Sequence, residues 1–201
     1  MPATRRTLTS SARRGLAALI ALVGLGPVAC KDIYAPRADA PTVEGKLAVT
    51  PFTGSKVNEE SGLFITALQA TEVRETGYDA VLDLTTDGRV VIYPASYITR
   101  CSGCVLGIAP SSVPFDQMYI APEQKGSTYR YNTPDTVSVG EPVYLVTKYN
   151  YCNPTNVATV DVYAKLVVDS VKSAERKIFV HGVVDPNCGF RELKPGEVPR
   201  R

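Results

Sequence analysis

Apolar and polar residues alternate with a period of two along much of the chain. In the clearest run, residues 157–169, apolar side chains occupy every second position: Ala158, Val160, Val162, Ala164, Leu166 and Val168. The positions between them hold mostly polar residues, with Val167 as the aliphatic exception. Successive side chains of a strand point to opposite faces, whereas a helix would scatter these positions around its circumference. The pattern predicts a strand with one face buried and the other in solvent.

A hairpin is predicted at Asp87-Gly88, a dipeptide typical of tight turns between antiparallel strands. With a two-residue loop at this point, Leu84 pairs with Val91 and Asp83 pairs with Ile92. Both flanking segments keep a consistent alternation in this register, which favours the assignment.

Several further short segments are rich in β-forming residues and are bounded by Gly, Pro, Asn or Asp. The predicted strands are residues 62–70, 97–101, 104–109, 128–132, 136–140, 142–151 and 177–184. Helical turns are expected only within 64–75 and 170–176. Many short strands of this kind predict an all-β protein, an antiparallel β-sandwich or barrel, and we take the sandwich as the expected fold class.

One segment of the predicted sandwich carries a family resemblance. Residues 137–146 read V-S-V-G-E-P-V-Y-L-V, which resembles the V-x-V-G-x-x-V-x-L run of bacterial immunoglobulin-like modules. This resemblance implies an immunoglobulin-like sandwich. The chain contains no Trp, so the buried Trp of antibody domains is absent.

Residues 1–29 have the pattern of an export signal. A basic region with Arg5 and Arg14 at its ends precedes an apolar run of 11 residues, 15–25. That length is typical of a signal peptide and falls short of the ~20 residues that span a bilayer. The residues around Arg5 also loosely resemble a twin-arginine signal, so the export route stays open.

The end of this signal resembles the cleavage box of bacterial lipoproteins. Gly26-Pro27-Val28-Ala29 precedes Cys30, with Pro27 where that family usually has Leu. The resemblance implies that Cys30 is lipidated and becomes the first residue of the mature protein. The alternative is an ordinary secretory signal followed by an unpaired Cys30. A lipidated Cys30 would anchor the protein in the bacterial cell envelope, at the outer membrane or the periplasmic face.

The remaining chain divides into three predicted parts. Residues 30–61 are rich in Pro, Ala and charged residues and are expected to form a flexible tether. Residues 62–190 contain the predicted strands and form the sandwich domain, and residues 191–201 form a polar C-terminal tail. At 201 residues, the chain has room for one ordinary domain.

The charge balance of the expected mature protein argues against nucleic-acid binding. The formal net charge of the chain is +2, but four of its arginines lie in the signal segment. Without residues 1–29 the chain has 18 basic and 20 acidic residues. Nucleic-acid binding depends on the neutralisation of phosphates by Lys and Arg, which a slightly acidic domain does not favour.

Four cysteines remain when Cys30 is set aside: Cys101, Cys104, Cys152 and Cys188. An even number in an exported chain predicts disulfides. Ser102-Gly103 suits a two-residue hairpin loop, so a local pairing would join Cys101 to Cys104 across it and Cys152 to Cys188. The crossed pairings, a redox C-x-x-C pair and a zinc site are the alternatives.

The motif content predicts a protein without catalysis, metal or cofactor. The nucleotide-binding and hydrolase motifs G-x-x-x-x-G-K-[ST], G-x-G-x-x-G, G-x-S-x-G and H-E-x-x-H do not occur. The one histidine, His181, lies within a predicted strand. A hydrolase that uses two carboxylates stays open, because a sequence does not show which acids meet in space.

The aromatic residues give the one indication of binding. Tyr accounts for 11 of the 16 aromatic residues, and two pairs are spaced by two positions: Tyr129 with Tyr131, and Tyr149 with Tyr151. Residues i and i+2 of a strand share a face, so each pair predicts a flat amphipathic platform for a glycan or a protein. The alternative is a Tyr-rich edge of the core. We expect a non-catalytic envelope module that is structural or protein-binding, with glycan binding through these pairs as the alternative.

Overall fold

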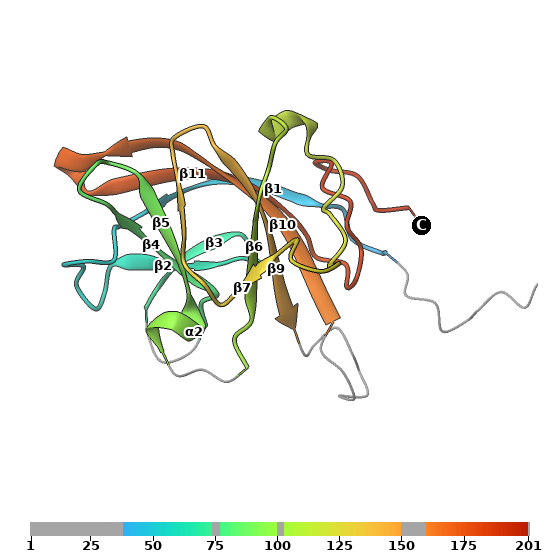
Figure 1. Ribbon diagram of the computed structural model, residues 1–201, viewed down its shortest axis with the longest axis horizontal. Coiled ribbons are helices and arrows are strands. Elements are labelled where there is room, and N and C mark those ends of the chain that lie inside the picture. Colours follow the sequence, from blue (N-terminus) through green and yellow to red (C-terminus); the bar gives the residue numbers. More distant parts are fainter. Residues whose placement is uncertain (1–37, 74–76, 100–102, 150–159, 201) are drawn as a thin grey trace, which may run out of the picture. The chain divides into compact units, whose positions relative to one another are not determined.

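Short apolar strands separated by turns build two antiparallel β-sheets in the computed structural model (Figure 1). It describes residues 38–73, 77–99, 103–149 and 160–200, which belong to a compact unit of residues 36–201. The predicted signal peptide and the lipidation site, Cys30, lie outside the described residues. Within the described part of the chain, no helix has the length and apolar character needed to cross a bilayer.

The two sheets contain six and five strands. In spatial order, the six-stranded sheet consists of β1 (Val43–Val49), β11 (Lys177–Asp185), β10 (Val160–Lys172), β9 (Pro142–Tyr149), β6 (Leu106–Pro110) and β7 (Arg130–Tyr131). The five-stranded sheet consists of β3 (Gln69–Glu72), β2 (Glu60–Phe64), β4 (Ala80–Leu84), β5 (Val90–Pro94) and β8 (Asp135–Val137). Among the described residues, three single-turn helices accompany them: α2 (Ala95–Ile98), η1 (Phe115–Gln117) and η3 (Ser173–Glu175). All strand pairings are antiparallel, which confirms the predicted all-β sandwich.

The main core lies between the inner faces of the two sheets. Leu63, Leu82 and Ile92 enter it from the five-stranded sheet, and Leu145 and Leu166 enter it from the six-stranded sheet. None of these side chains is more than 1 % exposed. Burial of such side chains stabilises the sandwich by about 1.5–3 kcal/mol each.

Strand β10 is buried on both faces, which corrects the prediction of a solvent-facing side. Val162, Ala164, Leu166 and Val168 face the core as predicted. On the other face, Tyr163, Lys165 and Val167 are between 1 % and 7 % exposed. The alternation therefore identified the core-facing residues but did not reveal that the second face is also covered.

The covering layer comes from the connection between β6 and β7 and from the C-terminal segment. Met118, Ala121 and Leu193 in these segments are fully buried. The N–H of Ala121 donates to the carbonyl of Arg191 at 2.7 Å, and that of Leu193 donates to the carbonyl of Tyr119 at 2.7 Å. The prediction of a polar tail over 191–201 is therefore wrong for residues 191–193, which pack against the domain.

The domain also begins earlier than the predicted boundary at residue 62. Residues 43–49 form β1, which pairs along its length with β11. Ahead of β1, the side-chain oxygen of Asn187 accepts hydrogen bonds from the N–H groups of Asp39 (2.9 Å) and Ala40 (3.1 Å). The expectation of a tether through residue 61 is wrong because the sheet and these bonds fix the chain from residue 39 onwards.

The hairpin between β4 and β5 has a longer loop than predicted. Leu84 pairs with Val90 and Asp83 pairs with Val91, one residue away from the predicted register. The N–H of Thr85 donates to the carbonyl of Arg89, so the loop has three residues, and Gly88 takes the positive φ of 81°. A three-residue loop with glycine in this conformation is the next most common hairpin type.

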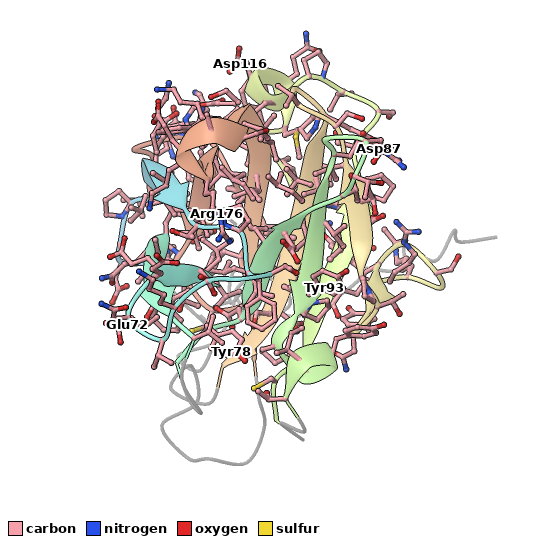
Figure 2. The ribbon with its side chains drawn as sticks, turned by 90° about the vertical axis from the view of Figure 1, so that its left-hand side faces the viewer. Glu72, Tyr78, Asp87, Tyr93, Asp116 and Arg176 are labelled. Carbon is pink, nitrogen blue, oxygen red and sulfur yellow. The ribbon has the colours of Figure 1, made fainter. Side chains whose placement is uncertain are left out.

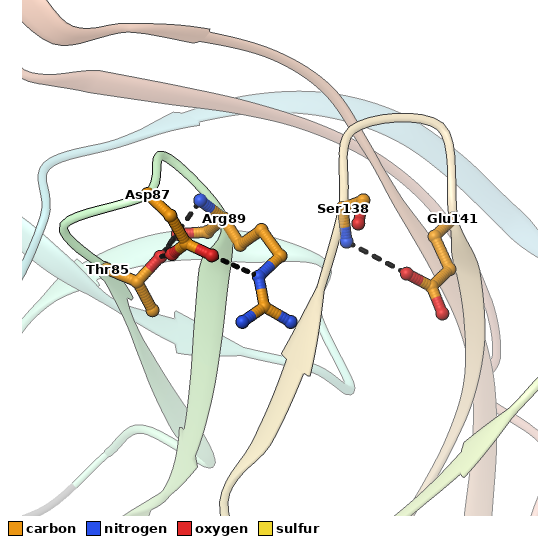
Figure 3. A network of polar contacts seen from close by, with 5 residues as sticks. All are labelled: Thr85, Asp87, Arg89, Ser138 and Glu141. Atoms are coloured by element: carbon orange, nitrogen blue, oxygen red, sulfur yellow. Dashed lines mark hydrogen bonds and ion pairs between the residues drawn. The ribbon is translucent and has the colours of Figure 1, made fainter.

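Side chains stabilise this turn and the turn that follows β8 (Figure 3). Thr85 Oγ1 donates to the carboxylate of Asp87, which also accepts a bond from Arg89 Nε at 2.8 Å. After β8, the N–H of Ser138 donates to the carboxylate of Glu141 at 3.0 Å. Residues 137–146, the segment that resembles immunoglobulin-like modules, thus cross from β8 of one sheet to β9 of the other.

Two of the predicted elements have a different structure. Residues 97 and 98 belong to the helix α2, although 97–101 was predicted as a strand. Strand β6 pairs with β7 and β9, so the predicted hairpin of 97–101 with 104–109 is wrong. Residues 69–72 form the strand β3, although a helical turn was expected within 64–75. The helical turn expected within 170–176 is confirmed by η3.

Candidate binding site

A cavity of about 300 Å³ opens on the outer face of the six-stranded sheet, beside β7. Its lining comes from four parts of the chain: the end of β9, the residue before β6, the connection that leads into β7, and β7 itself. The lining residues are Val105, Gln124, Gly126, Tyr129, Tyr131 and Lys148. This volume lies at the lower end of the range of small-ligand pockets.

The ring of Tyr131 lies over Gly107 of β6, where any side chain would clash with it. A Cβ atom on Gly107 would lie 2.8 Å from Cε1 of Tyr131 and 2.7 Å from Cγ1 of Val146. Side-chain atoms do not approach a Cβ this closely, so only glycine lets the Tyr131 ring lie over β6. The Tyr131 residue remains 36 % exposed and presents an aromatic surface at the cavity.

The rings of Tyr129 and Tyr131 lie together but do not form the predicted flat platform. Their centroids are 6.3 Å apart and their planes are inclined at 43°. Tyr129 is only 4 % exposed and belongs to the outer-face cluster with Tyr163 and Leu193. The spacing correctly placed the two rings on one side, but only Tyr131 is available to a ligand.

Gln124 connects two of the tyrosine hydroxyls around this cavity. The hydroxyl of Tyr131 donates to Oε1 of Gln124, and Nε2 of Gln124 donates to the hydroxyl of Tyr163 at 2.8 Å. Burial raises the pKa of the Tyr131 and Tyr163 hydroxyls above its ordinary value near 10. Both hydroxyls therefore stay protonated at physiological pH, and the network holds the Tyr131 ring in a fixed orientation.

The second predicted tyrosine pair is not described. Tyr149 is the last residue of β9, but its side chain is not described, and Tyr151 lies outside the described residues. The platform expected from this pair stays a prediction.

A larger and more polar cavity of about 700 Å³ lies near η3 and the β2–β3 hairpin. Four carboxylates line it, those of Glu59, Glu60, Glu72 and Glu175. Figure 2 shows Glu72 and Arg176 on this side of the molecule. Arg176 donates to the backbone carbonyls of Gly54 (3.0 Å) and Thr53 (2.6 Å), which fixes the loop after β1. Glu59 and Glu60 are adjacent in the chain, but Glu72 and Glu175 lie further along it, so no local pattern predicts that the four acids line one cavity.

His181 and Lys165 pack under the single-turn helix η1. Nε2 of His181 lies 2.8 Å from Oε1 of Glu44, and its ring centroid lies 4.6 Å from that of Phe115. Lys165 is 1 % exposed, and its Nζ donates to the carbonyl of Phe115 at 3.0 Å. Burial lowers the pKa of Lys165, opposed by the negative charges of Asp116 and Glu44. These contacts hold η1 against the sheet.

The predicted disulfide residues are only partly described. Cys104 packs against a small cluster with Tyr78, Val81 and Ala95 on the outer face of the five-stranded sheet. Neither Cys104 nor Cys188 is a free thiol. Cys101 and Cys152 lie outside the described residues, so the pairing of Cys101 with Cys104 and of Cys152 with Cys188 stays a prediction.

The described residues contain no group of three or more His, Cys, Asp or Glu side chains that could hold a metal ion. Comparison of the chain with models of protein families, with curated proteins and with solved structures finds no match.

Proposed function

We propose that this protein is an exported, lipid-anchored protein of the bacterial envelope whose β-sandwich is a non-catalytic saccharide-binding module. The observation that carries the proposal is the cavity beside β7, where the exposed ring of Tyr131 stands next to the Gln124 amide and the Lys148 ammonium. Anchoring through Cys30 rests on the signal-like segment and the cleavage box before it.

The chemistry of the lining favours a saccharide over a purely apolar ligand. An aromatic ring offers a flat apolar surface for the C–H groups of a sugar ring. Amide, ammonium and hydroxyl groups at the rim offer donors and acceptors for sugar hydroxyls. The Tyr131–Gln124–Tyr163 hydrogen bonds fix these groups before a ligand arrives, which reduces the entropy lost on binding.

A protein-binding module is the second candidate, and one surface favours it. Tyr119, Ile120 and Val198 are 51 %, 58 % and 46 % exposed and surround a cavity of about 220 Å³. Three exposed apolar side chains at one place are a common feature of protein contacts. The cavity at Tyr131 is larger and combines an aromatic ring with polar groups, so we place saccharide binding first.

Titration of the exported domain with a panel of trisaccharides tests the proposal. We expect at least one of cellotriose, chitotriose, maltotriose and mannotriose to bind, as measured by calorimetry. Tyr131→Ala should weaken that binding at least about tenfold because it removes the aromatic surface, and Tyr131→Phe should retain most of it. The control is Tyr97→Ala, which removes a ring that is 60 % exposed on the helix α2, away from the cavity lining.

Absence of binding to the whole panel, or equal weakening by Tyr97→Ala, would contradict the proposal. Cleavage of a bound trisaccharide during the titration would instead support the carboxylate hydrolase alternative. Chromatography of the recovered sugar distinguishes the two.

The membrane anchor has its own test. Cys30→Ser in the full chain should move the protein from the membrane fraction to the soluble envelope fraction, since the lipid chains are attached to that residue. A variant that stays with the membrane would show that the anchor is not at Cys30.

A further inference from the structure

Lys148 supplies the one formal charge in the described lining of the Tyr131 cavity. The other five lining residues are neutral at physiological pH, because burial raises the pKa of the Tyr129 and Tyr131 hydroxyls above its ordinary value near 10. Lys148 lies near the end of β9 and is half-buried, so it is partly removed from water. A ligand in this cavity therefore meets a positive charge beside an aromatic ring.

The Lys148 ammonium has no acceptor in the part of the chain that the structure describes. The other two lysines that are not exposed there both have one. Nζ of Lys165 donates to the carbonyl of Phe115 at 3.0 Å, and Nζ of Lys177 donates to the hydroxyl of Thr50 at 3.0 Å. An ammonium offers three donors, and a partly buried donor without an acceptor costs free energy. Lys148 is thus the half-buried lysine whose acceptor a ligand can supply.

Asp161 is the acidic neighbour that could neutralise Lys148 from the next strand. It stands opposite Lys148 in the pairing of β10 with β9, where Cβ atoms are close. Among the described side chains these two form no ion pair, and Asp161 is not part of the cavity lining. Burial is the main cause of the raised pKa of Tyr131, and the negative charge of Asp161 raises it further. Asp161 therefore weakens the attraction of the cavity for an anion from a distance, whereas Lys148 can contact the ligand directly.

The connection that leads into β7 contributes no unpaired negative charge beside the cavity. Its acid, Glu123, precedes the lining residue Gln124. The Glu123 carboxylate forms ion pairs with Lys125 and, at 3.4 Å, with Arg191. Two cations thus surround one carboxylate on this side, so an anionic ligand is not repelled from it.

These charges indicate which saccharides suit the cavity best. A sugar hydroxyl can accept a hydrogen bond from the Lys148 ammonium, but a carboxylate or sulfate accepts a charge-assisted bond that is roughly twice as strong. The Tyr131 ring still offers its face to the C–H groups of the same sugar. A sugar that carries an anionic substituent uses both features, whereas a neutral sugar uses only the ring fully.

We infer that Lys148 is a specificity-determining residue of the Tyr131 cavity and selects acidic saccharides, whose anionic substituent accepts a hydrogen bond from its ammonium. This inference rests on the proposed function and adds the class of sugar to it. Tyr131 supplies a stacking surface that many saccharides share, and Lys148 supplies the charge that distinguishes an acidic sugar from its neutral counterpart.

The test compares the tightest-binding trisaccharide of the panel with two anionic counterparts. One has its C6 hydroxymethyl groups oxidised to carboxylates, and the other has its C6 hydroxyls sulfated. We expect at least one of them to bind the native protein about tenfold more tightly than the neutral sugar, as measured by calorimetry. This gain should shrink between about 50 mM and 500 mM NaCl, because salt screens the charges.

Lys148→Gln should reduce the gain from about tenfold to about onefold, and Lys148→Arg, which keeps the charge, should retain most of it. Lys125→Gln is the matched control. It removes the same charge close to Gln124, but the Lys125 side chain is 82 % exposed, is paired with Glu123 and does not line the cavity. It should leave the gain near tenfold.

The outcomes separate this inference from the proposed function. If the neutral sugar binds and requires Tyr131, but neither anionic counterpart binds more tightly, the selection of acidic sugars is wrong while saccharide binding stands. If the gain survives Lys148→Gln, or Lys125→Gln removes it equally, the role of Lys148 is wrong. If no trisaccharide binds, both proposals fail. A melting temperature of Lys148→Gln within a few degrees of that of the native protein shows that a lost gain is not a loss of folding.

Discussion

Asp185, at the end of β11, is fully buried and uses only one of its carboxylate oxygens. Oδ1 accepts bonds from the N–H of Asn187 (2.9 Å) and from its side-chain amide (2.7 Å). Oδ2 is buried without a hydrogen-bond partner in the described chain. Burial raises the pKa of Asp185 to about 6. The two hydrogen bonds from Asn187 lower this pKa, and the negative charge of Glu192 raises it.

This raised pKa makes the stability of the domain depend on pH. The unfolded chain ionises Asp185 near pH 3.8, whereas the folded protein keeps it protonated up to about pH 6. The neutral side chain therefore stabilises the fold below about pH 4, and this contribution is lost as the pH rises through 6. Asp185→Asn should raise the free energy of unfolding relative to the native protein by about 1–3 kcal/mol more at pH 8 than at pH 4.

Thermal unfolding at pH 4 and pH 8 measures this difference. Asp169→Asn, a change at a half-exposed residue of β10, serves as the control and should show no comparable dependence. A melting-temperature difference between Asp185→Asn and the native protein that is equal at the two pH values would show that Asp185 does not titrate in this range.

At the scale of the elements, Asp79 links the two sheets. Its carboxylate accepts a bond from the N–H of Ile65, which follows β2, at 2.7 Å. It also accepts a bond from the hydroxyl of Thr147, on β9 of the other sheet, at 3.0 Å. Ile65 and Thr147 are 1 % and 2 % exposed, so water does not replace this acceptor when it is removed.

Asp79→Ala should destabilise the domain by about 2–3 kcal/mol, because it leaves a buried N–H and a buried hydroxyl without an acceptor. Urea unfolding measures the loss. Asp169→Ala removes only an exposed ion pair with Lys46 and should cost less than about 1 kcal/mol. Similar unfolding midpoints for the two variants would contradict the linking role of Asp79.

Local sequence patterns predicted some of the strands correctly and missed others. The alternation in β10 predicted its core-facing residues because strand periodicity is local. The register at Asp87-Gly88 was wrong by one residue, since glycine at positive φ suits both two- and three-residue loops. Strand β1 was missed because its charged residues, Glu44 and Lys46, suggested solvated chain, whereas they lie on a sheet edge.

At the scale of the whole molecule, the cavity beside Tyr131 depends on contacts between residues that are distant in the sequence. The spacing of Tyr129 and Tyr131 predicted that the two rings would be neighbours. Lys148 lies beside Tyr131 only because β6 pairs with both β7 and β9. No local pattern predicts which strands become neighbours, so the cavity exists only in the folded chain.

Saccharide binding beside Tyr131 is the central property that we propose for this molecule. Amide chemical shifts of the ¹⁵N-labelled domain during titration with the binding trisaccharide test it directly. We predict that the largest shifts belong to residues 124–131 and 148, with little change around Tyr119, Ile120 and Val198. Shifts centred on those three residues or on the acidic cavity of Glu72, or no shifts with any of the four trisaccharides, would contradict the claim.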